Sequence, residues 1–548
     1  MSASAVGRLG LVTVPSGSQL IIGDPAASPS AITLDASGII VYGSLRAGSA
    51  TCRLQSSVTI TLHGARPSTK AERDALPPWH KGIYVQDGTL DLHGRQYART
   101  WARLARTVAV GDDTIYLQAT VNWEAGQQVV LVTTAMKDSR DWHHNEVMTV
   151  ARVLGATELP AGAIAAVQLT SAAHYEHLAI DAYQGEVGLL TRIITIQGAA
   201  TDSEPNDIEP VSCEHSRWIL GSRTVPCATS SLTGFGAHVL VTGQAAIARV
   251  AGVEFYRVGQ TNVLARYPMH FHVMGNAGQH SYVTDSSVHR SYYRCVSIHG
   301  TNQVLVSSNV GYDVIGYCMY LEDGVEELNR IEYNLVAHVH FIGTPARSGS
   351  QFMDDVAQSD DLTLPADVTA APFYITNSYN YIVGNAASGG WAGFAFPELP
   401  SPIKTHRHLA GSVTPNARPL LLFDGNTAHS SSYWWGNAGL IYFGGKLRHP
   451  DPASDALVYN GGRSNPPRDT CEVEPCTLRN DCRCPNDRTI YQRITNTKVF
   501  LSPGVGVLHW GKRPEIVGYE AHDVALSLSI LGFGFISNAL VRCRTGAN

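Results

Sequence analysis

The stretches RCVSIHG at residues 294–300 and YCMYLED at residues 317–323 decide the fold of this chain. Their cysteines are 23 residues apart, and apolar residues occupy the first and third positions after each cysteine. Short apolar strands that recur every ~20 to 25 residues between polar turns are the signature of a β-solenoid. We therefore predict that the two stretches lie in successive coils of a parallel β-helix.

An asparagine followed by a small or apolar residue recurs along the same region. These steps begin at Asn309, Asn334, Asn385 and Asn426. Asparagine at equivalent turns tolerates left-handed backbone and can hydrogen-bond to its neighbours in adjacent coils. Leucine-rich repeats have a similar period, but the leucine spacing that they need is missing here.

Long amphipathic helical patterns are rare in the rest of the chain. Alternating runs such as Leu11–Val14, Val58–Leu62 and residues 82–85 indicate strands. One short helix is expected at Ser68–Leu76, which the prolines that follow end. Charged residues make up 16% of the chain against a usual ~25%, and glycine and proline are plentiful. This composition favours an all-β protein with tight turns.

The charge and the apolar segments exclude some classes of partner. A formal net charge of −6 provides no overall basic field for nucleic acid or a membrane surface. Residues Met1–Pro15 contain one arginine and no long apolar core, so they predict a strand and no visible secretory signal. Serine, glycine and asparagine interrupt the apolar segment Val524–Val541, which favours a buried strand pair over a membrane span.

The ten cysteines point to an oxidising compartment without fixing the pairing. Four of them fall in a Cys-rich loop at residues 465–488: Cys471, Cys476, Cys482 and Cys484. Two local disulfides are the favoured interpretation, and a structural zinc site is the alternative. Cys213 and Cys227 could close another loop.

Several stretches carry a family resemblance. LARYPMHFH at residues 264–272, RCVSIHGTN at residues 294–302 and LEDG at residues 321–324 resemble one family. It includes the cell-migration-inducing hyaluronan-binding protein, the transmembrane cell-surface hyaluronidase and the fibrocystin-like proteins. VTVPSG at residues 12–17 resembles the opening of that family's domain named for its eight glycines.

The resemblance implies a right-handed parallel β-helix preceded by a β-rich domain of the eight-glycine type. The expected boundaries are residues 1–100 for that domain, 101–200 for a β-rich connecting segment and 201–548 for the β-helix. It also implies binding and depolymerisation of an anionic polysaccharide such as hyaluronan, by a secreted or cell-surface protein. A non-catalytic glycan-binding or matrix-interaction protein and a polysaccharide lyase are the alternatives.

Stacked coils bring distant residues together. Paired strands lie ~4.8 Å apart, so equivalent positions form columns. If the apolar residues of the two deciding stretches face inward, His299 and Glu322 face outward beside each other. Cys295 and Cys318 would also face outward, within reach of a disulfide.

The same column offers metal ligands. His270 and His272 are one residue apart and share a face of a strand. Together with His299 and Glu322 they could bind a divalent metal, and imidazole with carboxylate suits zinc or manganese, with calcium a further option. Polar side chains stacked in a β-helix can also satisfy one another in ladders that have no chemical role.

Catalysis by hydrolysis would need two carboxylates ~5 to 9 Å apart. The candidates are Glu322 with Asp313 or Asp323, and His299 could tune the pKa of Glu322. A lyase would instead remove the proton next to the uronate carboxylate while an arginine or a metal neutralises that carboxylate.

Substrate contacts are expected from basic and aromatic side chains near this column. Guanidinium groups can pair with sugar carboxylates, and rings can stack on sugar faces. The candidates are Arg266, Arg290, Arg294, Tyr267 and Tyr320. A second basic spot, interpreted as a solvated loop, consists of Lys404, His406, Arg407 and His408.

Overall fold

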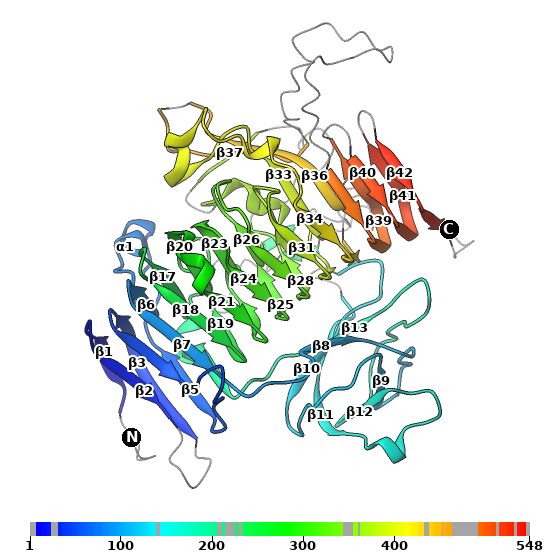
Figure 1. The fold of residues 1–548 in the computed structure, drawn as a ribbon, viewed down its shortest axis with the longest axis horizontal. Helices are drawn as coiled ribbons and strands as arrows, with labels where there is room; N and C mark the ends of the chain where they lie inside the picture. Colours follow the sequence, from blue (N-terminus) through cyan, green and yellow to red (C-terminus); the bar gives the residue numbers. More distant parts are fainter. Residues whose placement is uncertain are drawn as a thin grey trace, which may run out of the picture.

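The computed structural model is an elongated parallel β-helix with the chain termini at opposite ends (Figure 1). It describes residues 7–23, 31–138, 143–204, 233–342, 355–359, 362–431, 438–451, 453–462, 492–510, 514–530 and 534–543, and the backbone of 211–213 and 225–227. The all-β parallel β-helix expected from the sequence is confirmed.

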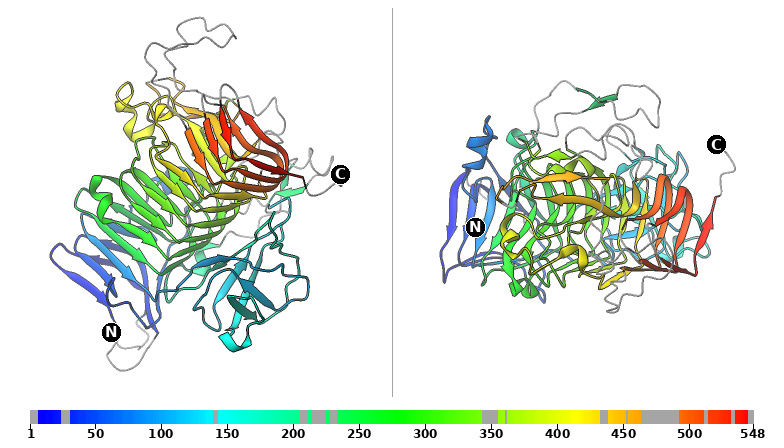
Figure 2. Two further views of the ribbon diagram at one scale, coloured as in Figure 1. Left: turned by 45° about the vertical axis from the view of Figure 1, so that its right-hand side comes forward. Right: turned by 90° about the horizontal axis from the view of Figure 1, so that it is seen from above.

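Each regular coil contributes three short strands, one to each of three columns. In one coil these strands are β24 (Leu305–Ser307), β25 (Val310–Ile315) and β26 (Met319–Leu321). Each pairs in parallel with its counterpart in the coils before and after it. Two further views show the resulting stack of coils (Figure 2). Apolar side chains that point inward from all three columns form one continuous core.

The first column is a separate twelve-stranded sheet. Besides β24, its strands are β2 (Gln19–Ile22), β4 (Ser44–Ala47), β7 (Thr89–His93), β18 (Ile247–Ala251), β21 (Tyr282–Thr284), β27 (Arg330–Glu332), β31 (Tyr381–Val383), β34 (Leu422–Asp424), β38 (Gln492–Thr495), β40 (Pro514–Val517) and β42 (Phe535–Ser537).

The second and third columns join into one large sheet because β3 (Ile32–Val41), β39 (Lys498–His509) and β41 (Glu520–Ile530) each run through both. Besides these and β25, the second column contains β5 (Val58–Leu62), β14 (Ile194–Gly198), β19 (Val253–Val258), β22 (Ser287–Ser291), β28 (Leu335–His340), β32 (Ala386–Ser388), β35 (Thr427–His429) and β43 (Leu540–Arg542). Besides β26, the third contains β1 (Leu9–Val14), β6 (Gly82–Gln86), β17 (His238–Thr242), β20 (Met269–Gly275), β23 (Val296–Thr301), β30 (Phe373–Tyr374), β33 (Phe394–Glu398) and β36 (Gly439–Arg448).

The chain leaves the β-helix after β7 and returns at β14. Between them lies an antiparallel sheet with its own apolar core, which we call the insert (residues 101–189). Its strands are β8 (Trp101–Arg103), β9 (Thr114–Leu117), β10 (Gln128–Leu131), β11 (Glu146–Val153), β12 (Ala165–Leu169) and β13 (Glu186–Leu189). The insert packs on the outer face of the second column, where Val130 and Val132 meet Val310 and Leu335. It is the cyan part of Figure 1.

The insert lies where a connecting segment was expected at residues 101–200, but the residues before it do not form a separate domain. Strands from the first hundred residues are the first coils of the β-helix itself, since β5 pairs with β14 and β6 pairs with β17. Stacking allows strands separated by the whole insert to be neighbours. The insert therefore interrupts the solenoid and does not precede it.

Short elements complete the fold. The helix expected near residues 68–76 is α1, which Thr69 caps. The elements outside the columns are α1 (Lys70–Asp74), α2 (Ala200–Ser203), η1 (Ala156–Glu158), η3 (Asn276–His280), η4 (Pro365–Thr369), η5 (Lys404–Leu409), η6 (Pro415–Ala417), β15 (Val211–Cys213), β16 (Val225–Cys227), β29 (Val356–Ala357) and β37 (Val458–Asn460).

Cys295 and Cys318 form a disulfide that joins successive coils. The outward direction expected for both was wrong: they are buried in the core, because they precede β23 and β26 and do not share the alternation of those strands. Cys213 and Cys227 lie on the paired strands β15 and β16, whose side chains the structure does not describe. The Cys-rich loop at residues 465–488 lies outside the described residues.

The apolar C-terminal segment forms strands, as expected. Residues 524–530 complete β41, and β42 and β43 follow. The expectation of burial was wrong, because β42 and β43 are exposed. No helix within the described ranges is both long and apolar enough to cross a membrane.

The expected asparagine ladder is present between the first and second columns. The Oδ1 atom of Asn334 accepts from the backbone N–H and the side-chain amide of Asn309, both at 3.0 Å. Asn385 and Asn426 repeat this pattern in the following coils. All four side chains are buried.

Replacing one asparagine of this ladder should destabilise the β-helix. Asn334→Ala leaves two buried donors of Asn309 without an acceptor, so we expect the free energy of unfolding to fall by about 1–3 kcal/mol. Urea denaturation followed by circular dichroism measures this. An unchanged unfolding midpoint would show that the ladder does not stabilise the β-helix.

The insert contains a carboxylate whose ionisation should make stability depend on pH. Glu146 accepts from His177 Nε2 at 3.0 Å and from the backbone N–H groups of His174 and Tyr175. Burial alone would raise the pKa of Glu146, but these hydrogen bonds lower it from 4.5 to about 2. The ionised form therefore stabilises the fold above pH ~4.5, and this contribution is lost as the pH falls toward 2.

We accordingly expect the melting temperature of the native protein to fall more steeply below pH 4.5 than that of Glu146→Gln. Differential scanning fluorimetry from pH 2 to pH 7 measures both curves. Parallel curves would mean that Glu146 does not contribute in this way.

Candidate functional site

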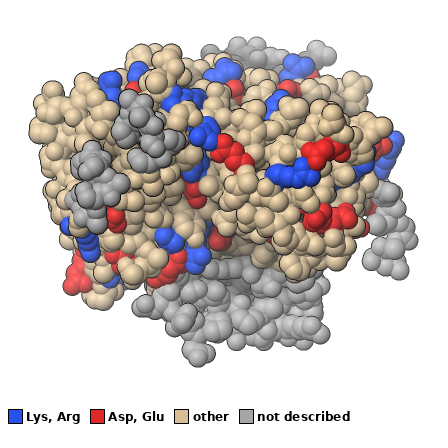
Figure 3. All heavy atoms as spheres, turned by 90° about the horizontal axis from the view of Figure 1, so that it is seen from below, with Lys and Arg blue, Asp and Glu red and all other residues tan. Residues whose placement is uncertain are grey.

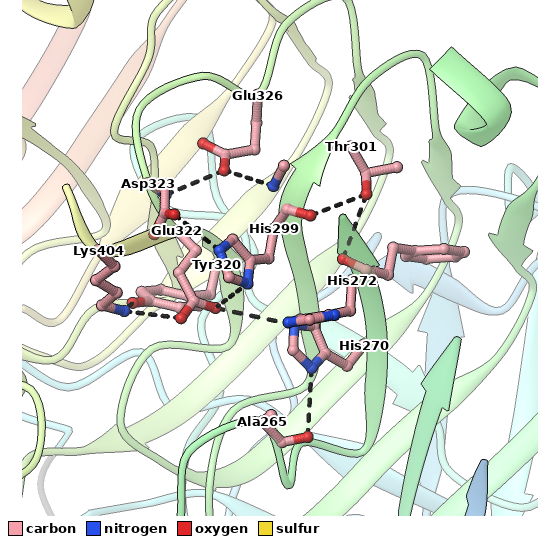
Figure 4. A network of polar contacts seen from close by, with 12 residues as sticks. Ala265, His270, His272, His299, Thr301, Tyr320, Glu322, Asp323, Glu326 and Lys404 are labelled. Carbon is pink, nitrogen blue, oxygen red and sulfur yellow. Dashed lines mark hydrogen bonds and ion pairs between the residues drawn. The ribbon is translucent and has the colours of Figure 1, made fainter. Parts of the chain in front are cut away.

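The outward residues of the third column form a cluster of imidazoles and carboxylates (Figure 4). β20 and β23 pair so that His272 lies opposite His299, and β23 pairs with β26, which ends just before Glu322. Strand alternation points these side chains away from the core. The expected neighbours His299 and Glu322 do meet, with 3.9 Å between His299 Nδ1 and Glu322 Oε2.

Three ligand atoms converge in this cluster, which we call the histidine–carboxylate cluster (His270, His299 and Glu322). His270 Nε2 also lies 3.9 Å from Glu322 Oε2, and all three atoms lie within 4.8 Å of one another. His270 Nε2 and Glu322 Oε2 are buried and have no hydrogen-bond partner. Atoms bound to one zinc ion at ~2.1 Å lie at most ~4.2 Å apart, so small shifts would bring these three around a metal ion.

The second nitrogen of each imidazole has a partner that orients the ring. His299 Nε2 donates to Asp323 Oδ2 at 2.8 Å, and His270 Nδ1 donates to the carbonyl of Ala265 at 3.3 Å. A carboxylate or carbonyl on the outer nitrogen fixes a metal-binding histidine in this way. The remaining nitrogens, His270 Nε2 and His299 Nδ1, face Glu322.

The charges of the cluster are strongly coupled. Burial would lower the pKa of His299, but the carboxylates of Glu322 and Asp323 raise it to about 9. Burial would raise the pKa of Glu322, but Lys404 and His299 hold it below its ordinary value. Without a metal ion, His299 is therefore protonated and Glu322 is ionised at neutral pH.

Two residues that cover the cluster come from η5. Lys404 Nζ pairs with Glu322 Oε1 at 2.7 Å and donates to the Tyr320 hydroxyl at 3.2 Å, and His406 Nδ1 donates to Asp323 Oδ2 at 2.9 Å. The interpretation of this basic spot as a solvated loop was therefore wrong for Lys404 and His406. A connection between β33 and β34 brings them over the column from 82 and 83 residues away, and no spacing in the sequence indicates this contact.

A further carboxylate that sequence reasoning missed is Glu326. It accepts from the backbone N–H groups of Gly300 and Asp323 at 2.8 and 3.0 Å, and burial raises its pKa. It thereby ties the end of β23 to the turn that carries Glu322. Its role is to hold the backbone of the cluster in place.

The cluster lies just below the surface. His270, His299 and Glu322 are 1%, 5% and 3% exposed, whereas His272 and His406 are partly exposed at its rim. His272 was expected to be a ligand, and its ring lies 4.9 Å from that of His299, at the rim of the three-atom site. Solvent therefore reaches the cluster at His272 and His406.

The expected pair of catalytic carboxylates is only partly assembled. Asp323 lies beside the cluster, but both His299 and His406 donate to its carboxylate, and after the cost of burial His299 holds its pKa well below the ordinary value. Asp313 is on β25 and pairs with His340, so it faces out from the second column while Glu322 faces out from the third. The expectation that Asp313 and Glu322 flank one bond was wrong.

The expected sugar-binding side chains are mostly buried. Arg294 is fully buried, pairs with Asp367 at 2.5 Å, and lies 4.2 Å from the ring centres of Tyr293 and Tyr320. Tyr267 and Tyr320 are each 1% exposed and pack around this pair. These residues support the cluster from below and do not form an open aromatic groove.

The other two arginines also have structural partners. Arg266 is buried and donates to the carbonyls of Leu76 and Pro77, which anchors the segment after α1. Arg290 is half-exposed and pairs with Glu204 at 3.0 Å. On the face seen in Figure 3, basic and acidic side chains are interspersed and form no extended basic stripe.

Comparisons with known proteins agree with the architecture. The family model described as "CEMIP beta-helix" matches residues 234–436, and the model described as "G8 domain" matches residues 3–105. The first match contains the histidine–carboxylate cluster, and the second covers the first coils of the β-helix.

Two curated relatives illustrate the likeness. Protein rliB of Dictyostelium discoideum is 41% identical over 533 residues, which cover 97% of this chain and 42% of that protein. Fibrocystin-L of Homo sapiens is 32% identical over 434 residues, which cover 74% of this chain and 9% of that protein. The chain thus spans less than half the length of these relatives.

Among solved structures, the tailspike protein gp49 from Pseudomonas phage LKA1 aligns over 96% of this chain and 72% of its own, with 11% identity and a TM-score of 0.23. A likeness at this level carries no argument about function.

Proposed function

This chain belongs to the family of proteins that combine a G8 domain with a CEMIP-type β-helix, and on this premise we propose that it binds and depolymerises an anionic polysaccharide of the hyaluronan type. The reaction takes place at the histidine–carboxylate cluster with the help of a divalent metal ion. We further propose that the protein works outside the cell, where disulfides such as Cys295–Cys318 persist.

One observation carries this proposal: three ligand atoms of His270, His299 and Glu322 converge, and two of them are buried without a hydrogen-bond partner. Buried polar atoms in native proteins nearly always have a partner, so an orphaned pair suggests an ion. Two imidazoles and one carboxylate suit zinc or manganese better than calcium, which prefers oxygen ligands.

The residues around the cluster have separable roles. A bound metal ion would supply a Lewis acid for the carboxylate or acetamido oxygen of the sugar. Asp323 and Ala265 orient the two imidazoles, and Lys404 neutralises the second oxygen of Glu322. In this proposal His272 and His406, which are partly exposed, contact the sugar chain.

Incubation of the purified protein with hyaluronan of defined length tests this function. We expect the polymer to shorten with zinc or manganese present, to remain intact with a chelator, and to remain intact with His270→Ala. The exposed His280 provides a matched control, because His280→Ala leaves the cluster untouched. Unshortened polymer with folded, metal-loaded protein would contradict the proposal.

The products of this incubation also distinguish elimination from hydrolysis. Elimination leaves an unsaturated sugar that absorbs near-ultraviolet light, whereas hydrolysis leaves none. Asp323 is hydrogen-bonded to two imidazoles and Glu322 is paired with Lys404, so both carboxylates are already engaged, whereas an ordinary two-carboxylate hydrolase needs two available ones. We therefore place metal-assisted chemistry ahead of the two-carboxylate mechanism.

A second candidate function is glycan binding without cleavage. The burial of the cluster under η5, together with the burial of Tyr267 and Tyr320, favours a structural role for the metal ion. In that case hyaluronan would bind with unchanged length, and His270→Ala would lower the melting temperature without altering the binding affinity.

A further inference from the structure

A second group of metal-ligating side chains lies on another face of the β-helix. Asp313 on β25 and His338 and His340 on β28 point outward from the second column, underneath the insert. We call these three residues the interface cluster. The polysaccharide chemistry proposed above makes no use of them.

The three side chains are brought together by strand pairing. β25 and β28 pair in register, with Tyr312 opposite Ala337 and Val314 opposite Val339. Asp313 and His338 thus occupy equivalent places in successive coils. Asp313 Oδ1 lies 3.1 Å from His340 Nε2, and one ligand atom from each of the three residues falls within 4.8 Å of the others.

The insert supplies the group that orients His338. The Nδ1 atom of His338 donates to Asp138 Oδ1 at 2.6 Å, and Asp138 is fully buried. Asp138 is itself held by Asn145 and Ser388, at 2.9 and 3.1 Å. Because Nδ1 is engaged, Nε2 is the nitrogen of His338 that remains for an ion, as in other carboxylate–histidine–metal arrangements.

A further imidazole lies beside these residues. The ring centre of His143, also from the insert, is 4.1 Å from that of His338. His143 Nδ1 accepts from the backbone N–H of Asn145 at 3.2 Å, so Nε2 carries the proton of the neutral ring and His143 lines the site without being one of its ligands. The side chain of Asp313 is 41% exposed, which gives an ion access from solvent.

We propose that Asp313, His338 and His340 bind a second divalent transition-metal ion at the junction between the insert and the β-helix. Imidazole and carboxylate ligands suit zinc or manganese. Asp138 of the insert is a positioning residue for this ion, so the ion couples docking of the insert to the second column. This site is independent of the histidine–carboxylate cluster, because the two lie on different columns.

Metal content of the full chain tests this inference. The protein is stripped with a chelator, equilibrated with zinc alone, dialysed and measured by plasma mass spectrometry. We expect two zinc ions per native chain, one in His340→Ala, one in His270→Ala and none in the double variant. His280→Ala should retain two.

The result that would overturn the inference is equal zinc content in the native protein and in His340→Ala. If circular dichroism shows that His340→Ala does not fold, the zinc content of Asp313→Asn is compared instead, because this variant changes only a half-exposed carboxylate. Loss of one ion from either variant supports the site even if His270→Ala loses none, so this test stands apart from the function proposed above.

A second readout reports on coupling to the insert. Zinc should raise the melting temperature of the native protein more than that of Asp313→Asn, since an ion that binds only the folded state stabilises it. Equal increases in the melting temperature of the two proteins would contradict the proposed coupling between the ion and the docking of the insert.

Discussion

Asp367→Ala is expected to lower the free energy of unfolding by about 3–5 kcal/mol, the usual cost of leaving one member of a buried ion pair without its partner. Asp367 and Arg294 are both fully inaccessible and 2.5 Å apart. Tyr293 also donates to Asp367, at 2.8 Å. Removal of the carboxylate would therefore leave a buried guanidinium without its charged partner, beside the Tyr293 hydroxyl at 3.3 Å and the rings of Tyr293 and Tyr320.

Urea denaturation of the native protein and of the variant measures this cost. A double variant, Arg294→Met with Asp367→Leu, is the matched control, because apolar replacement of both partners avoids an unpaired charge. It should recover most of the lost stability. A single variant as stable as the native protein would show that the pair contributes little to folding.

Glu322→Gln is expected to weaken zinc binding at the histidine–carboxylate cluster by more than 100-fold. The change replaces a charged ligand atom by a neutral one at nearly constant shape. Loss of a residue that only orients a ligand typically costs about 10–100-fold in metal affinity, and loss of the ligand should exceed this. Asp323→Asn, which removes the carboxylate that orients His299 and His406 but removes no ligand atom, should fall within that lower range.

Competition with a chromophoric chelator measures both affinities. The ordering matters most: Glu322→Gln should bind zinc more weakly than Asp323→Asn, and His280→Ala should match the native protein. Equal affinities for all four proteins at this cluster would contradict its assignment as a metal site.

The stacking of coils could be predicted from the sequence because it depends on local repeats. The 23-residue spacing of Cys295 and Cys318 placed His299 beside Glu322, and the structure has them 3.9 Å apart. The asparagine ladder followed from the same repeat. Such register is set by inward apolar residues two positions apart.

The surroundings of the cluster could not be predicted, because they come from long connections with no repeat. Lys404 reaches Glu322 from η5, and Asp138 reaches His338 across 200 positions of sequence. Asp313 was expected as a partner of Glu322 but lies on β25 in the second column, because the sequence shows the coil period but not the corners of the coil. Burial of Arg294 also depends on Asp367, which lies in a connection after β28.

Diffraction from zinc-soaked crystals at the zinc absorption edge tests the metal assignment most directly. We expect an anomalous peak about 2.0–2.2 Å from His270 Nε2, His299 Nδ1 and Glu322 Oε2. Zinc bound elsewhere on the molecule with no peak between these three atoms would contradict it.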